Sequence, residues 1–141
     1  MSYEIIKKVP TSEEIIRQIP LSSSGYANIA RHQQEIEAIL SGKDERKLLI
    51  VGPCSAWPSE AVLDYANRLL ELSKQVEDKI KIIMRVYIQK PRTAKGWTGP
   101  INQPNPLIEP DIEAGIWYCR KLMVQISELG LPIADECLFT H

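Results

Sequence analysis

One short stretch of the sequence concentrates side chains suited to binding an anion. Residues 84–99, MRVYIQKPRTAKGWTG, contain Arg85, Lys90, Arg92, Thr93 and Lys95. Arginine presents a planar fork to a carboxylate or a phosphate, and lysine supplies a mobile point charge. The stretch therefore predicts a binding loop for a phosphorylated or carboxylated ligand. Composition alone leaves open the alternative that it is a solvated basic loop on the surface.

Two other segments contain residues that could take part in chemistry. Cys54 follows the turn Gly52-Pro53, where a thiolate could be a soft ligand for a divalent metal or a nucleophile. A small buried residue that fills the turn is the alternative. Glu136 could act as an acid, a base or an orienting group, or it could pair with a basic residue for structural reasons. Both readings stay open for each residue.

Each of these segments lies at the end of a predicted strand. Residues 48–51, LLIV, form a continuous apolar run closed by Gly52-Pro53, which predicts a strand buried on both faces. Further strands are predicted at residues 80–86 and 133–137. Two amphipathic helices are predicted between the strands, with the apolar stripes Val62, Tyr65, Ala66, Leu69, Leu72, Val76 and Ile112, Ile116, Cys119, Leu122, Met123, Ile126, Leu129. Because the carboxyl ends of parallel strands meet at one edge, the three segments should converge there.

The first 45 residues are predicted to form an extension of two helices. Thr11-Ser12-Glu13-Glu14 offers a capping box for a short helix that Pro20 ends. A second helix should follow the turn at residues 22–25 and stop at Gly42. Its loose apolar stripe consists of Ile29, Ile36, Ile39 and Leu40. His32 lies in this helix and His141 is the last residue, and neither suggests a metal or base constellation.

The alternation of strands and helices predicts an α/β fold with a parallel sheet. Two strand-helix-strand crossovers fit either a doubly wound sheet or the opening of a (β/α)8 barrel, and periodicity alone does not separate them. A complete barrel needs about 250 residues, so 141 residues provide about three of its eight strands. Such a piece should leave apolar strand faces exposed.

Composition excludes several classes of function. The formal net charge is −1, from 17 basic and 18 acidic residues, so no general field would attract nucleic acid or an anionic membrane. No apolar run approaches the length of a membrane span, and the start MSYEIIKKVP lacks a signal-peptide core, so a cytoplasmic location is expected. Three cysteines without C-x-x-C spacing suggest neither a disulfide framework nor structural zinc; Cys119 and Cys137 are expected to pack in the interior.

The ordered motifs LLIVGPCS, IIMRVYIQKPRTAKGWTG and GLPIADE resemble the signature of class I 3-deoxy-arabino-heptulosonate-7-phosphate (DAHP) synthases. The similarity extends over residues 1–137. It implies that residues 46–141 are the opening β/α units of a TIM (β/α)8 barrel. It also implies that residues 1–45 are an amino-terminal extension that contributes to a dimer contact and to feedback regulation. A homo-oligomer is therefore expected.

The resemblance also implies substrates, a cofactor and residue roles. Enzymes of that family condense phosphoenolpyruvate (PEP) with erythrose 4-phosphate, using a divalent metal of the manganese, iron, cobalt or zinc class. By similarity, Cys54 is a metal ligand, Arg85 contacts PEP, and Lys90 and Glu136 are catalytic. The residues expected to bind substrate are Arg85, Lys90, Arg92, Thr93 and Lys95.

Three departures from the family pattern bear on activity. Ala56-Trp57-Pro58 stands where the family continues Ile-His-Asp, and Thr98 stands where it has a lysine, a loss that Lys95 would have to offset. The family's other metal ligands, a histidine, a glutamate and an aspartate, belong to later strands. We therefore expect the chain to be inactive alone and catalytic only within a longer or complemented polypeptide.

Two other hypotheses remain at this stage. The first is a non-catalytic interaction module that binds a full-length homologue through the extension and the open sheet edge. The second is half of a doubly wound nucleotide-binding sheet. The absence of a G-x-G-x-x-G or P-loop motif after any predicted strand counts against the latter.

Overall fold

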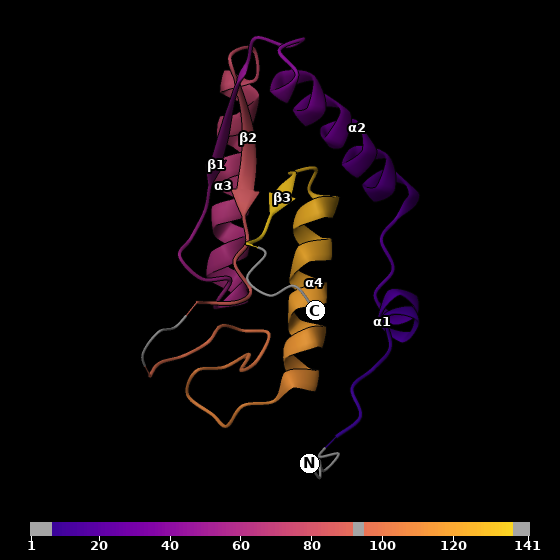
Figure 1. Cartoon of the computed structure of the whole chain (residues 1–141), viewed down its shortest axis with the longest axis vertical. Helices are drawn as coiled ribbons and strands as arrows, with labels where there is room; N and C mark the ends of the chain where they lie inside the picture. Colours follow the sequence, from indigo (N-terminus) through magenta and orange to yellow (C-terminus); the bar gives the residue numbers. More distant parts are fainter. Residues whose placement is uncertain (1–6, 92–94, 137–141) are drawn as a thin grey trace.

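A parallel three-stranded sheet lies at the centre of the chain. The computed structural model describes residues 7–91 and 95–136, and in it the strands have the order β1-β2-β3 (Figure 1). Their bounds are β1 (Lys47–Val51), β2 (Ile80–Arg85) and β3 (Ile133–Ala134). In the register, Val51 pairs with Met84, and Arg85 pairs with Ala134. The carboxyl ends of the strands therefore meet at one edge, as predicted, and the α/β class is confirmed.

Within the described residues, four helices accompany the sheet. They are α1 (Ser12–Gln18), α2 (Ser23–Leu40), α3 (Ser59–Val76) and α4 (Ile112–Glu128). The predicted capping box starts α1: the Thr11 hydroxyl accepts from the Glu14 amide, and the Glu14 carboxylate accepts from the Thr11 amide. Beyond α4, Gly130 has a φ of +93°, a left-handed conformation that suits glycine at a helix end.

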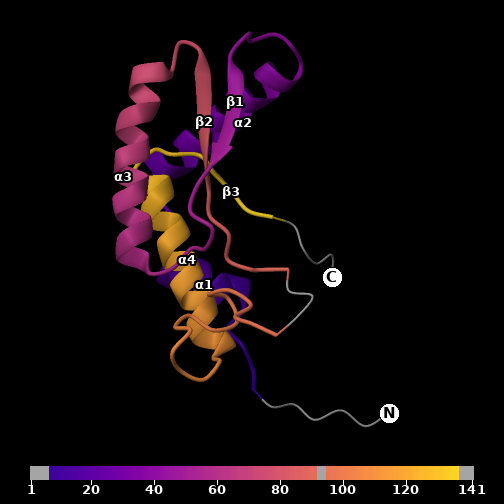
Figure 2. The same ribbon diagram turned by 90° about the vertical axis from the view of Figure 1, so that its left-hand side faces the viewer.

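The hydrophobic core lies between one face of the sheet and the helices α3 and α4, which cover that face together (Figure 2). Met84 of β2 is fully buried in this core, and Leu122 and Ile126 of α4 are at most 1% exposed. Cys119 is 2% exposed, and burial raises the pKa of its thiol to about 12. The prediction that Cys119 packs in the interior is confirmed, whereas Cys137 lies outside the described residues.

The opposite face of the sheet is open at β1, and here one prediction is wrong. β1 was expected to be buried on both faces, yet Leu49 and Ile50 are 44% and 56% exposed. Ile50 points to the face that no helix covers, whereas Leu49, the register partner of the core residue Ile82, points to the helix face at the edge of the sheet, where cover is incomplete. The broader prediction, that three strands would leave apolar side chains uncovered, is confirmed. β3 is shorter than predicted and consists of two residues.

The extension packs along α4 and across the base of the sheet. Glu128 accepts hydrogen bonds of 2.7 Å from both the amide and the hydroxyl of Ser22, and the Arg120 guanidinium donates to the Ile19 carbonyl at 2.9 and 3.1 Å. The apolar stripe of α2 is only partly covered, because Ile29 is 36% and Leu40 is 74% exposed. Among the residues that the structure describes, no helix is long and apolar enough to cross a membrane.

Candidate functional site

Two loops meet at the carboxyl edge of the sheet. The loop after β1, residues 52–58, carries Cys54, and the loop after β2 carries the basic residues. Arg85, the last residue of β2, donates from Nη2 to the Gly52 carbonyl at 2.8 Å and to the Pro53 carbonyl at 3.4 Å. A methyl group on Gly52 would lie 2.2 Å from the Arg85 carbonyl oxygen, so only glycine allows this approach. The start of the Cys54 loop is thus fixed against β2.

Lys90 brings the basic loop onto Cys54. Its Nζ lies 3.2 Å from the Cys54 Sγ and donates a hydrogen bond to the Cys54 carbonyl. The backbone of the same residue donates to the Thr98 carbonyl at 3.0 Å, and Ile101 donates to the Ile88 carbonyl at 3.1 Å. These bonds hold the two sides of the basic loop together. The structure therefore places Lys90 and Cys54, which are 36 residues apart, in one site.

Arg85 keeps part of its hydrogen-bonding capacity unused. Its Nε is buried and has no hydrogen-bond partner among the described residues, while its guanidinium carbon lies 4.8 Å from the centre of the Tyr87 ring. A buried N–H donor without a partner costs about 1–3 kcal/mol. An anion that accepted from Nε would remove that cost, so the side chain is suited to binding a carboxylate or a phosphate.

The other predicted site residues are not gathered as closely. Glu136 follows β3 at the same edge and is exposed, and Lys95 is also exposed. Arg92 and Thr93 lie outside the described residues. Beside Glu136, the Asp135 carboxylate accepts from the amides of Ile88 and Glu136, and partial desolvation raises the pKa of Asp135.

Tyr118 is a contributor to the site that sequence reasoning missed. From α4 its hydroxyl donates a 2.8 Å hydrogen bond to the carbonyl of Ala56, which is fully buried in the Cys54 loop. Burial raises the pKa of Tyr118 to about 12, so the hydroxyl keeps the proton that it donates. Next to Ala56, Trp57 meets Trp97 of the basic loop edge-on, with ring centres 6.2 Å apart. Residues 56–58, which differ from the family pattern, are thus stabilised by contacts with Tyr118 and Trp97.

A complete metal site is not present in this part of the chain. The described residues contain no cluster of three histidine, cysteine, aspartate or glutamate side chains that could surround an ion. In the loop after β1, Cys54 offers a soft ligand, and its sulfur faces the Lys90 ammonium. A catalytic divalent ion needs several protein ligands to fix its geometry. The donor set at residues 7–91 and 95–136 therefore does not fit a catalytic metal by itself.

Comparison with known proteins identifies the family. The sequence model of the DAHP synthetase I family matches residues 19–140. The chain belongs to the DAHP synthetase I family. This confirms the resemblance that the motifs around Cys54, Lys90 and Glu136 indicated.

Individual members of the DAHP synthetase I family are similar over most of this chain. The Tyr-sensitive phospho-2-dehydro-3-deoxyheptonate aldolase of Escherichia coli K12 is 41% identical over 128 residues, which are 91% of this chain and 36% of the relative. The phospho-2-dehydro-3-deoxyheptonate aldolase of Corynebacterium glutamicum is 39% identical over 131 residues, which are 93% of this chain and 36% of the relative. The chain therefore spans little more than a third of the relatives that it matches.

A solved structure supports the same assignment. The phospho-2-dehydro-3-deoxyheptonate aldolase from Francisella tularensis SCHU S4 superposes with a TM-score of 0.90 at 36% sequence identity. The match covers 95% of this chain and 39% of that structure. The family fold is thus present over nearly the whole chain, including the sheet and helices that position the candidate site.

Removing the Tyr118 hydroxyl is expected to loosen the Cys54 loop. Tyr118→Phe deletes the hydrogen bond to the Ala56 carbonyl, and one such bond stabilises a structure by about 0.5–1.5 kcal/mol. Amide hydrogen exchange in residues 52–58 should accelerate by about two- to tenfold. Tyr65→Phe, which removes a hydroxyl from the neighbouring helix α3, is the matched control and should leave the loop unchanged. Equal acceleration in both variants would contradict a specific role for Tyr118.

Proposed function

We propose that this chain supplies the first part of the active site of a DAHP synthase, which condenses PEP with erythrose 4-phosphate and releases phosphate. Membership of the family supports the reaction class. The observation that carries the proposal to this site is the contact of Lys90 with Cys54 beside Arg85, at the carboxyl edge of a parallel sheet. Active sites of (β/α)8 barrels lie at that edge. We propose that residues 46–141 open such a barrel after an extension at residues 1–45.

Charge explains why these residues suit the two substrates. PEP carries a phosphate and a carboxylate, and erythrose 4-phosphate carries a second phosphate. In the proposal, Arg85 receives an anionic group of PEP through its unpaired Nε, while Lys90, Arg92 and Thr93 hold erythrose 4-phosphate, with Lys95 nearby. A desolvated arginine gives bidentate contacts that fix the orientation of the ligand.

The chemical step assigns a second task to Lys90. The methylene carbon of PEP attacks the aldehyde carbon of erythrose 4-phosphate, and the Lys90 ammonium donates to the aldehyde oxygen as it becomes an alkoxide. Water then adds to the cationic carbon left on PEP, and phosphate leaves with the bridging oxygen. Glu136 is proposed to orient or accept a proton at this step. By resemblance to the family, the proposal includes a divalent metal of the manganese, iron, cobalt or zinc class. Because the described residues do not form a complete metal site, no reaction step is assigned to the metal.

Complementation of the barrel tests this proposal. The chain alone should show no loss of PEP absorbance with erythrose 4-phosphate and manganese. Turnover should appear when it is mixed or fused with the later part of the E. coli relative, which begins beyond the matched 36% of that protein. In the active mixture, Lys90→Ala should lower kcat/KM by about a hundredfold or more. Lys79→Ala, which alters a lysine that is 81% exposed at the far edge, is the control.

An interaction module remains the second candidate function. The exposed apolar residues Leu49 and Ile50 of the edge strand β1 favour it, because an uncovered apolar strand can dock on another chain. A stable, inactive complex with a full-length homologue would support this candidate. Turnover of the complemented barrel, lost on Lys90→Ala, would support the synthase instead.

A further inference from the structure

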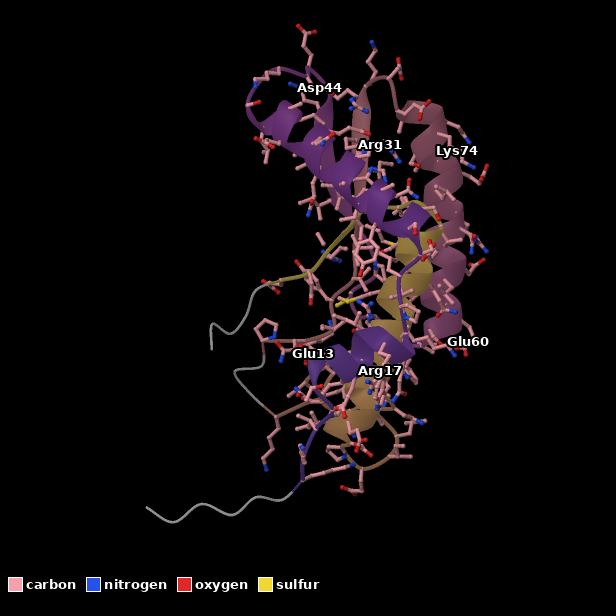
Figure 3. The ribbon with its side chains drawn as sticks, turned by 90° about the vertical axis from the view of Figure 1, so that its right-hand side faces the viewer. Glu13, Arg17, Arg31, Asp44, Glu60 and Lys74 are labelled. Carbon is pink, nitrogen blue, oxygen red and sulfur yellow. The ribbon has the colours of Figure 1, made fainter. Side chains whose placement is uncertain are left out.

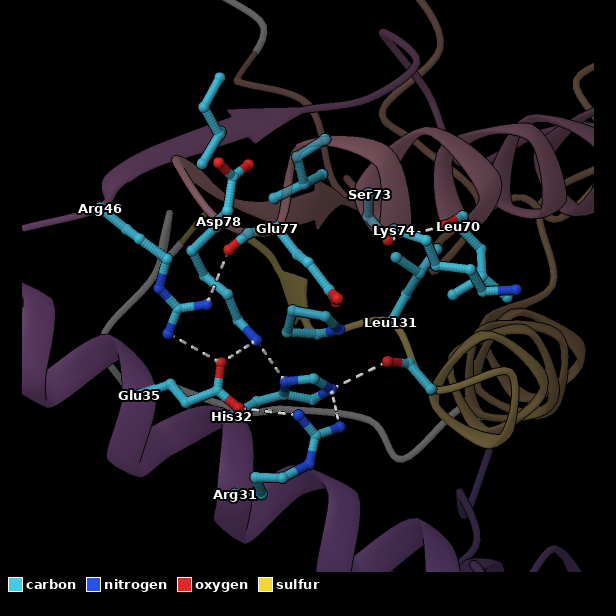
Figure 4. Close-up of a pocket in the computed structure, with 15 residues that line it drawn as sticks. Arg31, His32, Glu35, Arg46, Leu70, Ser73, Lys74, Glu77, Asp78 and Leu131 are labelled. Atoms are coloured by element: carbon cyan, nitrogen blue, oxygen red, sulfur yellow. Dashed lines mark hydrogen bonds and ion pairs between the residues drawn. The ribbon is translucent and has the colours of Figure 1, made fainter. Parts of the chain in front are cut away.

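A buried charged cluster lies at the opposite end of the sheet from the candidate active site. It joins His32 and Glu35 of α2 to Lys81 near the start of β2 and to Arg46 in the connection before β1 (Figure 4). His32 is 7% and Lys81 is 8% exposed. Figure 3 shows Arg31, Asp44 and Lys74 toward this end of the molecule, whereas Glu60, which begins α3, lies toward the other. The cluster is therefore separate from the loops around Cys54.

Hydrogen bonding fixes the protonation state of His32. The Lys81 ammonium has only donors, and its Nζ lies 2.7 Å from His32 Nδ1, so Nδ1 must accept. The opposite ring nitrogen, Nε2, lies 2.8 Å from the Gly130 carbonyl and 3.3 Å from Arg31 Nη2. Because a carbonyl can only accept and its contact is the shorter one, we assign the ring proton to Nε2, which donates to Gly130. This arrangement satisfies both nitrogens only when the imidazole is neutral with its proton on Nε2. His32 thereby links α2 to β2 and to the turn after α4.

Protonation of His32 would break this arrangement. A second ring proton on Nδ1 would point at the Lys81 ammonium and replace a hydrogen bond with two facing donors of like charge. A third cation is close, because Arg31 Nη2 lies 3.3 Å from Nε2. Unit charges at such distances repel strongly where water is excluded. The neutral His32 ring is therefore stabilised by hydrogen bonds at both nitrogens, whereas the protonated ring is destabilised by the neighbouring cations.

Glu35 does not neutralise that repulsion, because it already serves three cations. Its carboxylate accepts from Lys81 at 2.6 Å, from Arg31 at 2.7 Å and from Arg46 at 3.2 Å. Partial burial acts to raise the pKa of Glu35, but the hydrogen bonds and charges of these cations outweigh it and lower the pKa to about 2. Glu35 therefore stays ionised at every pH at which His32 titrates.

We propose that His32, Lys81 and Glu35 form a pH-sensitive latch that fastens the extension helix α2 to the base of the sheet, closed while His32 is neutral and released when it is protonated. The proposal is independent of the reaction assigned to the other end of the sheet. Its consequence is that the position of the extension relative to the sheet responds to acidification. The proposal rests on two hydrogen bonds of the His32 imidazole: it accepts one from the Lys81 ammonium and donates one to the Gly130 carbonyl.

The direction of the pH dependence follows from the surroundings of His32. Burial lowers the pKa of His32, the Gly130 carbonyl acts to raise it, Lys81 and Arg31 lower it, and Glu35 raises it, with a net decrease from 6.5. A histidine whose pKa is lower when docked stabilises docking above its ordinary pKa. That stabilisation is lost as the pH falls below about 6.5 toward the lowered pKa.

Other charged groups face the same cavity, which has a volume of about 570 Å³. Lys74, Glu77 and Asp78 line it from the end of α3, and Arg46 lines it with its partner Asp44 close by. The Asp44 pKa is lowered by hydrogen bonds to Arg46. Imidazole is the side chain whose ordinary pKa of about 6.5 lies in the range between pH 5 and 8, so His32 is the group facing this cavity whose titration the latch uses.

Hydrogen exchange and a histidine titration test the latch. We expect amide protection in residues 23–40 to fall severalfold between pH 7.5 and pH 5, after correction for intrinsic exchange, while residues 59–76 of α3 keep theirs. The sequence contains two histidines, so the nuclear magnetic resonance titration has two ring signals, and His32→Gln assigns them. The His32 midpoint should lie below 6.5, the ordinary value for a histidine. A midpoint at or above the value of free histidine would overturn the proposal.

Matched variants isolate the proposed pair. His32→Gln should make the protection of α2 independent of pH in this range, and Lys81→Met should shrink the change, because the opposing ammonium is gone. His141→Gln is the control and should retain the full change. If either cluster variant fails to fold, the wild-type titration and exchange still decide. A pH-dependent loss that persists in folded His32→Gln would also overturn the latch.

Discussion

Replacing Met84 with alanine is expected to lower the free energy of unfolding by about 2–5 kcal/mol. Met84 is 0% exposed and lies in the middle of the core, where β2 packs against α3 and α4. The substitution removes buried apolar surface and leaves a cavity that the surrounding strands and helices can close only in part. Complete domains are stable by only about 5–15 kcal/mol. A sheet with an open face has less margin, so this single change should cost much of the stability.

Denaturant unfolding measures this effect directly. The midpoint should shift far to lower denaturant with a similar slope, or the variant should already be unfolded in buffer. Leu107→Ala is the matched control, because Leu107 is 84% exposed and its truncation should change stability by less than about 0.5 kcal/mol. A loss of less than 1 kcal/mol for Met84→Ala would mean that α3 and α4 do not pack on β2 in solution as they do in the structure.

The sequence allowed the convergence of the site to be predicted, because it follows from topology. Once β1 and β2 are assigned as parallel strands joined by a helix, the residues after Val51 and those after Arg85 must meet at one edge. The contact between Lys90 and Cys54 is the result. The contribution of Tyr118 was not predictable in the same way. Its position depends on how α4 rotates against the sheet, which periodicity specifies only coarsely.

The burial of β1 was predicted wrongly for a physical reason. An apolar run such as residues 48–51 reports that both faces of a strand are suited to burial, but it does not report whether a second covering layer is present. Here the second layer is missing over Ile50, and the helix layer does not fully cover Leu49 at the edge of the sheet, so both remain exposed. The apolar character of Ile50 agrees with a barrel interior that the proposed later strands would enclose.

The sequence contains a signal of the charged cluster around Lys81. Lys81 is a single charge inside the apolar run IKIIM, which forms most of a central strand. A lysine in such a strand needs a partner for its charge, because an unpaired buried ammonium is very costly. Glu35 and His32, which lie three residues apart on helix α2, are the partners of the Lys81 ammonium. Sequence alone could have predicted a partner, but not which element supplies it.

Adding one methyl group at Gly115 should disturb the packing of α4 against the loop after β2. Gly115 is buried in the first turns of that helix, and a Cβ there would lie 2.0 Å from the carbonyl oxygen of Ile101 and 2.6 Å from its carbonyl carbon. These are backbone atoms, so the helix or the loop after β2 must move. Alanine favours a helix over glycine by about 1 kcal/mol. A clash with fixed backbone costs about 3 kcal/mol or more, so we expect Gly115→Ala to be net destabilising by about 2 kcal/mol.

The structure supplies a matched control for this clash in Gly25, the buried glycine of α2. A Cβ on Gly25 would lie 2.7 Å from Cγ and Cδ1 of Leu21 and 2.9 Å from the Glu128 carboxylate. These are side-chain atoms, which shift at less cost than backbone atoms, although Glu128 would have to adjust its hydrogen bonds from Ser22. Gly25→Ala should therefore destabilise the chain less than Gly115→Ala in the same denaturant experiment. The Ile101 amide donates a hydrogen bond to the Ile88 carbonyl across the basic loop. A shift of Ile101 in Gly115→Ala should therefore also raise the rate of amide hydrogen exchange in residues 95–101. Equal effects of the two substitutions would show that helix propensity, and not contact with the basic loop, decides what is tolerated at Gly115.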